Sequence, residues 1–271
     1  MSIKNNKEVY CYVINLESQK EKLTRIQIIL SKKFSNTIFF KAVNGNNLSE
    51  SEIRSVYNSA ETKKNIGRDM TLGEIGCALS HLAIMREVVN QDHIALILED
   101  DIDLKIDEVM LNKLIRKFPS KWECMLLGHH SRYSRGEEGI KSVWYKKELA
   151  YGIHCLRFAE RPSGGYGYLI NKSGAEKILA RYDKITKPVD VWQDDILNIY
   201  GVTPTLVNIE NILTTKSNLD NEREKTIREN NKYKTKKILY FNHFLNTSGI
   251  KSASNTFRKN INKLKFLSIY R

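Results

Sequence analysis

The chain has 271 residues, of which 41% are hydrophobic and 28% are charged, and its formal net charge is +13. This composition is typical of a soluble globular protein with one large α/β domain or two smaller ones. No apolar run approaches the roughly 20 residues that cross a bilayer, and Met1–Asn6 lack an apolar stretch, so we expect neither a transmembrane helix nor a signal peptide.

The positive charge is concentrated near the C-terminus. Residues 216–271 hold 14 Lys and Arg against 4 Asp and Glu, whereas residues 1–215 hold 30 against 27 and are nearly neutral. This division predicts a globular body and a basic tail whose partner is an anion. The chain has four cysteines, Cys11, Cys77, Cys124 and Cys155, which are far apart and lie among apolar neighbours. We therefore expect them to be small core residues in a reducing compartment rather than disulfides or zinc ligands.

The chain opens on a pattern that is typical of nucleotide-binding α/β folds. Residues 8–16 are rich in β-branched and aromatic side chains and predict a buried strand. A turn leads into a helix whose apolar residues recur at helical spacing, and residues 37–43 predict a second strand. A G-x-G-x-x-G fingerprint is absent, which argues against a dinucleotide-binding Rossmann site.

A turn at Asn44–Asn47, a short helix from Ser49 and a polar loop over 58–71 are expected next. A strong helix then begins at Thr71, with one apolar face that contains Ile75, Ala78, Leu79, Leu82, Met85 and Val89. His81 lies close to that face. It is either a satisfied core histidine or a ligand, and the spacing alone leaves both interpretations open.

The stretch Ile94–Asp101 is the expected centre of the fold. Five apolar residues predict a strand that is buried on both faces, and Glu99, Asp100 and Asp101 follow directly. Ligands of open α/β sheets bind at the carboxyl ends of the strands. Three adjacent carboxylates favour a hard divalent cation such as Mg²⁺ or Mn²⁺. The alternative is an acidic loop after a core strand.

The second half continues the alternation of helices and strands. A helix over 107–118, a strand over 123–128, short strands of an insertion at 143–145 and 153–156, a glycine-rich segment at 163–170, a helix over 171–182 and a final strand at 205–209 are expected. A second acidic cluster contains Asp190, Asp194 and Asp195. It fits a general base in a substrate pocket, or the acidic first turn of a helix.

Several of these stretches together resemble glycosyltransferase family 25, the lipooligosaccharide-biosynthesis glycosyltransferases. The matching segments are YVINL at 12–16 with Arg25 following, AVNG at 42–45, LGEIGCALSHL at 72–82, ILEDD at 97–101, GGYGYLINKSGAEKIL at 164–179 and PVD at 188–190. They occur in the family's order over about residues 9–215. The chain departs from the pattern at Asn44, where Asp is expected, which puts a charge-dependent role there in doubt.

The resemblance implies an α/β fold of the glycosyltransferase-A type, a Rossmann-like mixed sheet flanked by helices, over residues 1–215. It does not cover the tail, where the charge and the apolar spacing predict a basic, helical C-terminal extension over 216–271. It implies an inverting transfer of galactose or glucose from a UDP-hexose, with Mn²⁺ (or Mg²⁺). Asp101 would bind the metal with Glu99 in support. The donor-binding residues would be Asn15, Leu16, Asn44, His81, Glu99 and Asp100.

Inverting transfer needs a base that takes the proton of the acceptor hydroxyl. Asp190 is the first candidate because it lies in the family-like PVD segment, and Asp194 and Asp195 are close rivals. The sequence does not choose among the three.

The resemblance also implies a lipid-linked lipooligosaccharide acceptor, and therefore a cytoplasmic enzyme at the inner face of a bacterial cytoplasmic membrane. On a helix, Phe257, Ile261, Leu264 and Leu267 would share a face among basic residues, which suits association with an anionic membrane surface. The alternatives for the tail are a solubilising segment and a helix that packs on the body.

Two other functions compete with the transferase. A metal-dependent phosphohydrolase would also use acidic strand ends, and the basic tail could serve a nucleic-acid-binding protein. The body is nearly neutral and does not interleave aromatic residues with Arg, so we expect no nucleic-acid partner.

Overall fold

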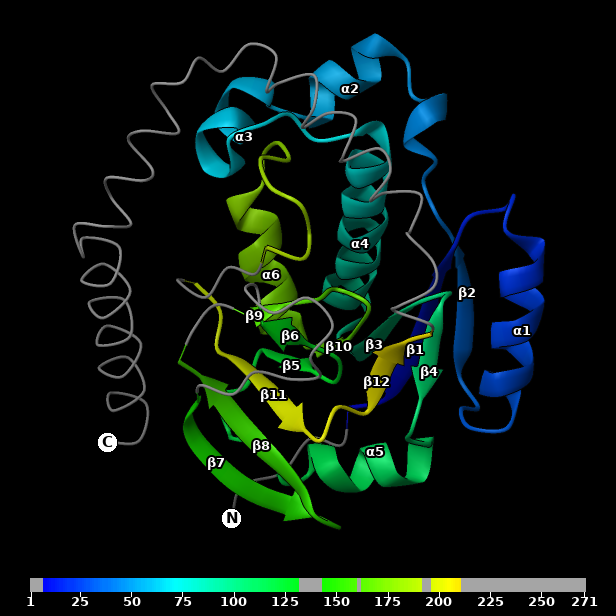
Figure 1. The fold of residues 1–271 in the computed structure, drawn as a ribbon, viewed down its shortest axis with the longest axis vertical. Coiled ribbons are helices and arrows are strands. Elements are labelled where there is room, and N and C mark those ends of the chain that lie inside the picture. Colours follow the sequence, from blue (N-terminus) through cyan, green and yellow to red (C-terminus); the bar gives the residue numbers. More distant parts are fainter. Residues whose placement is uncertain (1–6, 132–142, 160–161, 192–195, 211–271) are drawn as a thin grey trace.

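The computed structural model describes residues 7–131, 143–159, 162–191 and 196–210. Within them, a mixed eight-stranded sheet forms the centre of the molecule (Figure 1). Its strands in spatial order are β2 (Thr37–Lys41), β1 (Val9–Asn15), β3 (Ile94–Glu99), β10 (Gly167–Ile170), β5 (Cys124–Leu126), β11 (Ile199–Thr203), β8 (Ile153–Phe158) and β7 (Val143–Ala150). Two small sheets pair β4 (Ile102–Leu104) with β12 (Val207–Ile209), and β6 (His130–Ser131) with β9 (Pro162–Ser163).

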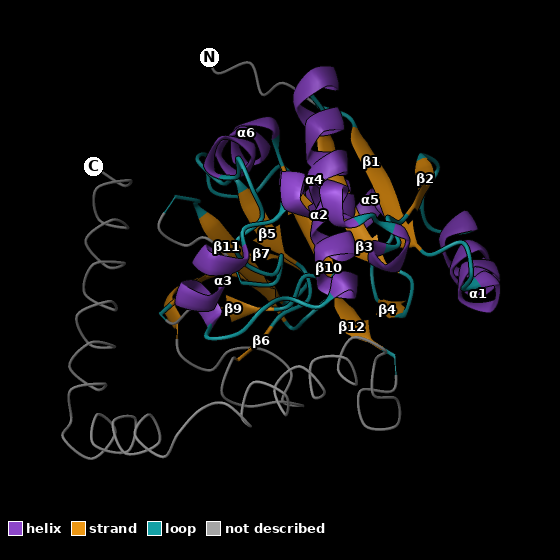
Figure 2. Ribbon diagram, turned by 90° about the horizontal axis from the view of Figure 1, so that it is seen from above, coloured by secondary structure: helices purple, strands orange, loops and turns teal. Residues whose placement is uncertain are grey.

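Helices cover both faces of the sheet. They are α1 (Lys20–Ser31), α2 (Glu50–Val56), α3 (Ser59–Ile66), α4 (Leu72–Gln91), α5 (Glu108–Ile115) and α6 (Lys172–Arg181), with a 3₁₀ turn η1 at Gly45–Asn47. One core packs α4 and α6 against one face, and the other packs α1 and α5 against the opposite face. In Figure 2, α4 and α6 lie side by side. None of these helices is both long and apolar enough to cross a membrane.

Strand direction explains why the acidic segment lies where it does. β2, β1 and β3 run parallel, and β10 is antiparallel to both β3 and β5. β3 and β5 therefore point the same way, and their carboxyl ends meet at the same edge of the sheet. Residues Ile94–Leu98 are completely or almost completely buried, because helices cover both faces of β3. The predicted mixed sheet flanked by helices is confirmed.

The prediction of a polar loop over residues 58–71 was wrong. The polar stretch 58–71 contains α3, which Asn58 caps at its N-terminus and Gly67, in the left-handed conformation, ends. Only Thr62 of this helix is fully buried, so the sequence carries no apolar stripe that would have revealed it. The stability of this short helix depends on its ends and neighbours instead.

The predicted insertion strands are the edge of the main sheet. β7 and β8 form a longer hairpin than expected, and β8 pairs antiparallel with β11. β11 itself was missed, since the five residues of Ile199–Thr203 follow the acidic cluster without an obvious break in the sequence. Strand membership depends on these long-range pairings, which local patterns do not specify.

Candidate active site

The first part of the site forms where β1 and β3 end side by side. Their parallel register places Ile14 opposite Glu99, so the next residues of both strands, Asn15 and Asp100, are neighbours. The Asn15 amide Nδ2 donates a hydrogen bond to Asp100 Oδ2 at 2.6 Å, and Asn15 is only 6% exposed. Leu16 follows Asn15 in a half-buried turn, where its carbonyl accepts from the Gln19 amide. The structure therefore joins Asn15 and Asp100, which the sequence had assigned separately to the donor site.

A cation from α1 reaches the same carboxylates. Lys22 Nζ lies 3.3 Å from Asp100 Oδ1 and 3.7 Å from Asp101 Oδ2. Burial by itself would lower the pKa of Lys22, but the attraction of the two carboxylates outweighs it and the pKa is raised. Burial raises the pKa of Asp100, against the opposing effects of Lys22 and Asn15. Lys22 was not predicted as a site residue, although it lies one turn before the family-like Arg25.

Asp101 retains an oxygen that the described residues do not satisfy. Its Oδ1 is buried and has no hydrogen-bond partner among them, while its backbone carbonyl accepts from the Glu210 amide at 2.8 Å. Arg25 donates from Nη2 to the Ile102 carbonyl and forms an ion pair with Glu210, and its buried Nη1 also lacks a partner within the described chain. Buried polar atoms of this kind are costly unless a ligand or water meets them. Each of these two atoms could therefore meet a polar ligand or an ordered water.

The second part of the site lies between β3 and α4. Cys77, His81 and Glu99 each offer one ligand atom, and these atoms all lie within 4.8 Å of one another. His81 is fully buried, and burial lowers its pKa to about 3, so the imidazole is neutral near pH 7. One of its ring nitrogens, Nδ1, is 2.8 Å from the Tyr168 hydroxyl. His81, which the sequence left between core residue and ligand, is a buried residue beside two groups that can bind metal.

A close backbone contact positions α4 beside this edge. A side chain at Gly76 would meet the Val43 carbonyl oxygen at 2.4 Å and the Gly45 nitrogen at 2.6 Å. Ser80 strengthens the contact, because its hydroxyl accepts a hydrogen bond from the Val43 amide at 2.8 Å. The AVNG segment and the α4 motif are thus two sides of one interface. The Asn44 side chain is half-buried and accepts from the Asn46 amide, so in this structure it caps the turn.

Of the second acidic cluster, only Asp190 belongs to the described residues; Asp194 and Asp195 lie outside them. Asp190 is half-buried beside Gly165, where an added Cβ atom would lie 3.8 Å from both the Cα and Cβ atoms of Asp190. The carbonyl of the next residue, Tyr166, accepts a hydrogen bond from the Glu99 amide at 3.1 Å. The glycine-rich segment therefore connects the surroundings of Asp190 to the end of β3.

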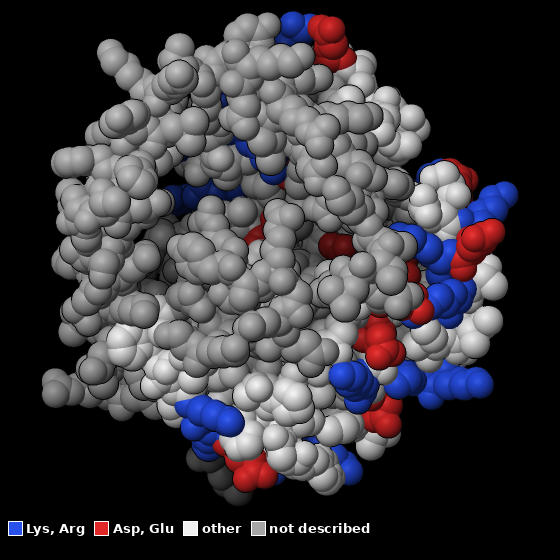
Figure 3. Space-filling model, in the orientation of Figure 1, with Lys and Arg blue, Asp and Glu red and all other residues white. Residues whose placement is uncertain are grey.

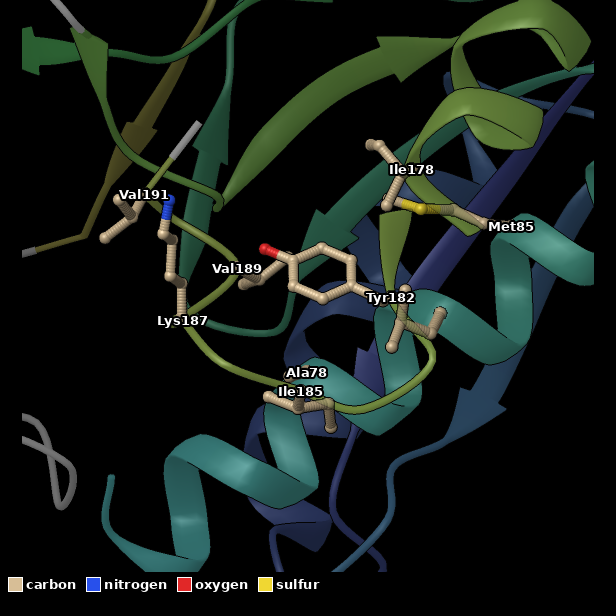
Figure 4. Close-up of a pocket in the computed structure, with 9 residues that line it drawn as sticks. Ala78, Met85, Ile178, Tyr182, Ile185, Lys187, Val189 and Val191 are labelled. Carbon is tan, nitrogen blue, oxygen red and sulfur yellow. The ribbon is translucent and has the colours of Figure 1, made fainter. Parts of the chain in front are cut away.

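An apolar pocket adjoins Asp190 (Figure 4). Val189 and Val191, the residues on either side of Asp190, both line it. The remaining lining residues come from α4, α6 and the segment after α6: Ala78, Leu82, Met85, Ile178, Tyr182, Ile185 and Lys187. The pocket therefore offers mainly hydrophobic contacts, and Asp190 itself is not among its lining residues.

The described residues that are visible in Figure 3 carry charges of both signs. In Figure 3, blue and red side chains alternate along the edge that α1 occupies, and red atoms are visible in the recessed middle of this face. Among the described residues, Lys41 forms an ion pair with Glu17, and Arg25 forms one with Glu210. This distribution agrees with the nearly neutral composition of residues 1–215.

The cysteine prediction holds for three residues and differs at the fourth. Cys11, Cys124 and Cys155 are buried core residues, as expected. Cys77 is only partly buried and lies in the group with His81 and Glu99. The Cys-x-x-x-His spacing, which places both side chains on one side of α4, was the signal that could have separated it from the other three.

Comparison with known proteins supports the resemblance. The family model described as glycosyltransferase family 25 (LPS biosynthesis protein) matches residues 9–193. The chain is 26% identical over 210 residues to a procollagen galactosyltransferase 2 of Mus musculus, which covers 70% of this chain and 31% of the relative.

Two further relatives carry related names. A procollagen lysyl hydroxylase and glycosyltransferase of Acanthamoeba polyphaga mimivirus is 36% identical over 225 residues, with 74% of this chain and 23% of the relative covered. A glycosyltransferase 25 family member of Aedes aegypti is 27% identical over 180 residues, with 63% and 28% covered. The chain thus spans between about a quarter and a third of the length of the relatives it matches.

Proposed function

The chain belongs to glycosyltransferase family 25, and on this basis we propose that it is an inverting glycosyltransferase that moves a hexose from a UDP-sugar to a saccharide acceptor. One observation carries the proposal: two carboxylates, Asp100 and Asp101, directly follow β3 at one edge of a glycosyltransferase-A-like sheet. Asp190 packs beside Gly165, and the neighbouring Tyr166 carbonyl accepts a hydrogen bond from Glu99, the last residue of β3. Galactose is the preferred sugar, since several relatives are named galactosyltransferases.

Asp101 and Glu99 would hold a divalent cation, Mn²⁺ or Mg²⁺, with the donor diphosphate. The buried Oδ1 of Asp101, which has no hydrogen-bond partner among the residues that the structure describes, supports this assignment, because oxygen ligands suit a hard cation. When bound, such an ion stabilises the charge that develops on departing UDP. The donor would be bound by residues of the β1 and β3 ends and of α4: Asn15, Leu16, Asn44, His81, Glu99 and Asp100. Lys22 adds a positive charge beside Asp100 and Asp101.

Asp190 would act as the general base. A single displacement at the anomeric carbon needs no protein nucleophile, only a group that accepts the proton of the acceptor hydroxyl as it attacks. Asp190 is half-buried and packs beside Gly165, whose neighbour Tyr166 accepts a hydrogen bond from the last residue of β3. Asp194 and Asp195 remain rivals, and a comparison of the three Asn variants identifies the base.

The acceptor would be a lipooligosaccharide, LPS or related lipid-linked saccharide, in line with the family description as an LPS biosynthesis protein. The apolar pocket beside Asp190 could accommodate a less polar part of such an acceptor. The basic tail would bring the enzyme to the anionic inner surface of the cytoplasmic membrane of a bacterium. The names of several relatives instead point to procollagen as their substrate, so a collagen-like peptide is the competing acceptor in an assay.

The donor assignment is tested with Asp101→Asn. We expect the wild type to bind UDP more tightly in the presence of Mn²⁺, as measured by calorimetry, and the variant to lose this dependence while it keeps its fold. Asp103→Asn is the matched control, because Asp103 is an exposed carboxylate two residues further along the chain. Unchanged Mn²⁺ dependence in Asp101→Asn would remove Asp101 from the metal site.

A screen of UDP-sugars for donor hydrolysis then identifies the sugar. Turnover of UDP-galactose or UDP-glucose supports the transferase. Release of phosphate from simple esters, with no response to UDP-sugars, would support the metal-dependent phosphohydrolase instead. A thermal shift with RNA or DNA and none with UDP would support the nucleic-acid-binding alternative.

A further inference from the structure

The group of Cys77, His81 and Glu99 contains ligand types that differ from those of the proposed donor cation. Cys77 and His81 are four residues apart on α4, and Glu99 is the last residue of β3. One sulfur, one ring nitrogen and one carboxylate oxygen come within 4.8 Å of one another. Two different elements therefore bring three metal-binding groups to one point.

His81 supplies an independent sign that the group binds something. The residue is fully buried, and its Nε2 has no hydrogen-bond partner within the described part of the chain. Buried polar atoms are normally satisfied, so this nitrogen requires an explanation. The other nitrogen, Nδ1, is 2.8 Å from the Tyr168 hydroxyl. In the tautomer with the proton on Nδ1, this N–H donates a hydrogen bond to the Tyr168 hydroxyl oxygen. Nε2 then carries a free lone pair, as in metal-bound histidines.

We propose that Cys77, His81 and Glu99 bind a divalent transition metal of the zinc class, at a site distinct from the Mn²⁺ or Mg²⁺ position at Asp101. A thiolate and an imidazole select zinc, cobalt and similar ions, whereas Mg²⁺ prefers oxygen ligands alone. Three protein ligands leave one tetrahedral position for water or a substrate oxygen. Glu99 belongs to both sites, and its carboxylate has two oxygens to contribute.

The surroundings of the group suit an ion that enters from solution. Cys77 and Glu99 are partly exposed, while His81 is enclosed by the core between α4 and the sheet. An ion at this point would connect the end of β3 to α4 and would fix the orientation of Glu99 beside the donor site.

Cobalt is the probe, because a thiolate bound to Co²⁺ gives a charge-transfer absorption band. The full chain, freed of metal by a chelator, is titrated with Co²⁺ and then with Zn²⁺. We expect the band to appear with one Co²⁺ per chain and to vanish when Zn²⁺ displaces it. Cys77→Ser should abolish the band, and Glu99→Gln should weaken cobalt binding. Cys155→Ala, which removes a buried thiol elsewhere, should leave the band intact.

One further variant keeps the result decisive. Tyr168→Phe removes only the hydroxyl beside His81 Nδ1, so we expect cobalt affinity to fall by roughly 10–100-fold with the ligands still present. If Cys77→Ser does not fold, the Tyr168→Phe titration decides the matter, and unchanged affinity there overturns the proposal. Absence of the band in the wild type, or its persistence in a folded Cys77→Ser chain, also overturns it.

Asp101→Asn separates this proposal from the donor site. We expect this variant to keep the cobalt band while it loses Mn²⁺-dependent UDP binding. Loss of the band in Asp101→Asn would mean that a single metal site serves both groups and would overturn the assignment of two sites. Normal cobalt binding by a chain that never binds UDP would contradict the proposed function alone.

Discussion

Three consecutive carboxylates, Glu99, Asp100 and Asp101, have three different environments. Asp100 is mostly buried and is held by Asn15 and Lys22. Asp101 keeps one buried oxygen without a partner among the described residues, and Glu99 faces the thiol of Cys77 and the imidazole of His81. Adjacent carboxylates can therefore have different roles, because neighbouring groups such as Lys22 and Asn15 already bind one of them and leave the others available for a ligand.

Asp190→Asn tests the base at the residue scale. The amide is nearly isosteric with the carboxylate and cannot accept the proton, so we expect unchanged donor binding and a loss of transfer of ~10²–10⁴-fold. The rate of transfer and the affinity for UDP are measured on the same preparation. Asp183→Asn is the control, since Asp183 is an exposed carboxylate in the segment after α6. Normal turnover by Asp190→Asn, together with failure of an Asp194 or Asp195 variant, would transfer the role to that residue.

The ion pairs of Lys22 with Asp100 and Asp101 should make the stability of the folded chain depend on pH. The pKa of Lys22 in the folded chain is raised above 10.5, so its contribution is fully present below that value and is lost as the pH rises through the folded-state pKa. We expect Lys22→Met to melt at a lower temperature than the wild type at neutral pH. The difference should shrink in alkaline solution above the lysine pKa.

Lys20→Met on the same helix is the control, because Lys20 is exposed, whereas the lysine that forms the ion pairs with Asp100 and Asp101 is Lys22. Its melting temperature should follow that of the wild type at every pH. If the melting temperatures of Lys22→Met and the wild type differ by the same amount up to strongly alkaline pH, the proposed charge pairing is contradicted.

At the scale of elements, α4 positions the site. A capping box of Thr71 and Glu74 begins the helix, and Arg68 holds the Glu74 carboxylate through two hydrogen bonds of 2.7 Å. The contact of Gly76 with the Val43–Gly45 backbone then sets how closely the helix approaches the loop after β2. Cys77 and His81 occupy the next positions of the same helix. Their placement thus depends on a fixed helix start and a close backbone contact.

Gly76→Ala should disrupt this contact. Alanine favours the helix by up to ~1 kcal/mol, but its methyl group would overlap backbone atoms of Val43 and Gly45 that cannot move independently. We expect the overpacking to dominate and the free energy of unfolding to fall by roughly 1–3 kcal/mol. Denaturant titration measures the change. A variant as stable as the wild type would show that the loop moves away at little cost.

The whole molecule combines a nearly neutral body with a basic C-terminal segment that lies outside the described residues. The body contains the sheet, both cores and all the site residues that the structure describes. If the acceptor is held in a membrane, the tail and the body perform separate tasks: the tail provides attraction to an anionic surface, and the body provides chemistry. This division predicts that changes in the tail alter membrane binding alone.

Neutralising four basic residues tests that division in the full chain. We expect association with anionic vesicles to weaken by roughly 10²–10³-fold at low salt, since each basic residue near the surface contributes roughly 1 kcal/mol. Vesicle sedimentation measures binding, and UDP affinity should not change. The substitutions are Arg258→Gln, Lys259→Gln, Lys263→Gln and Lys265→Gln.

A matched control neutralises four exposed lysines of the body and should leave vesicle binding almost unchanged. These are Lys117, Lys121, Lys146 and Lys147. Neutral vesicles and high salt should suppress binding of the wild type. Equal binding by the tail variant and the wild type would exclude the tail from this role.

The sequence by itself determined the elements whose signals are local. The apolar run of β3, the helix that begins at Thr71 with its apolar face, and the helix that begins at Asn171 were all predicted, because periodicity and helix starts involve residues close together in the chain. The two acidic clusters were identified as candidate sites for the same reason. α3 was missed because its signals are polar caps within a polar stretch.

Only the tertiary structure decided which distant residues meet. The pairing of β8 with β11, the ion pair of Lys22 with Asp100 and the proximity of Cys77 to Glu99 all join segments that are far apart in the sequence. Strands pair through backbone groups that every residue carries, so the side-chain pattern of one strand does not name its neighbour. The packing of the helices on the sheet decides which strands become neighbours. The same packing brings together the Cys77 thiol, the His81 imidazole and the Glu99 carboxylate.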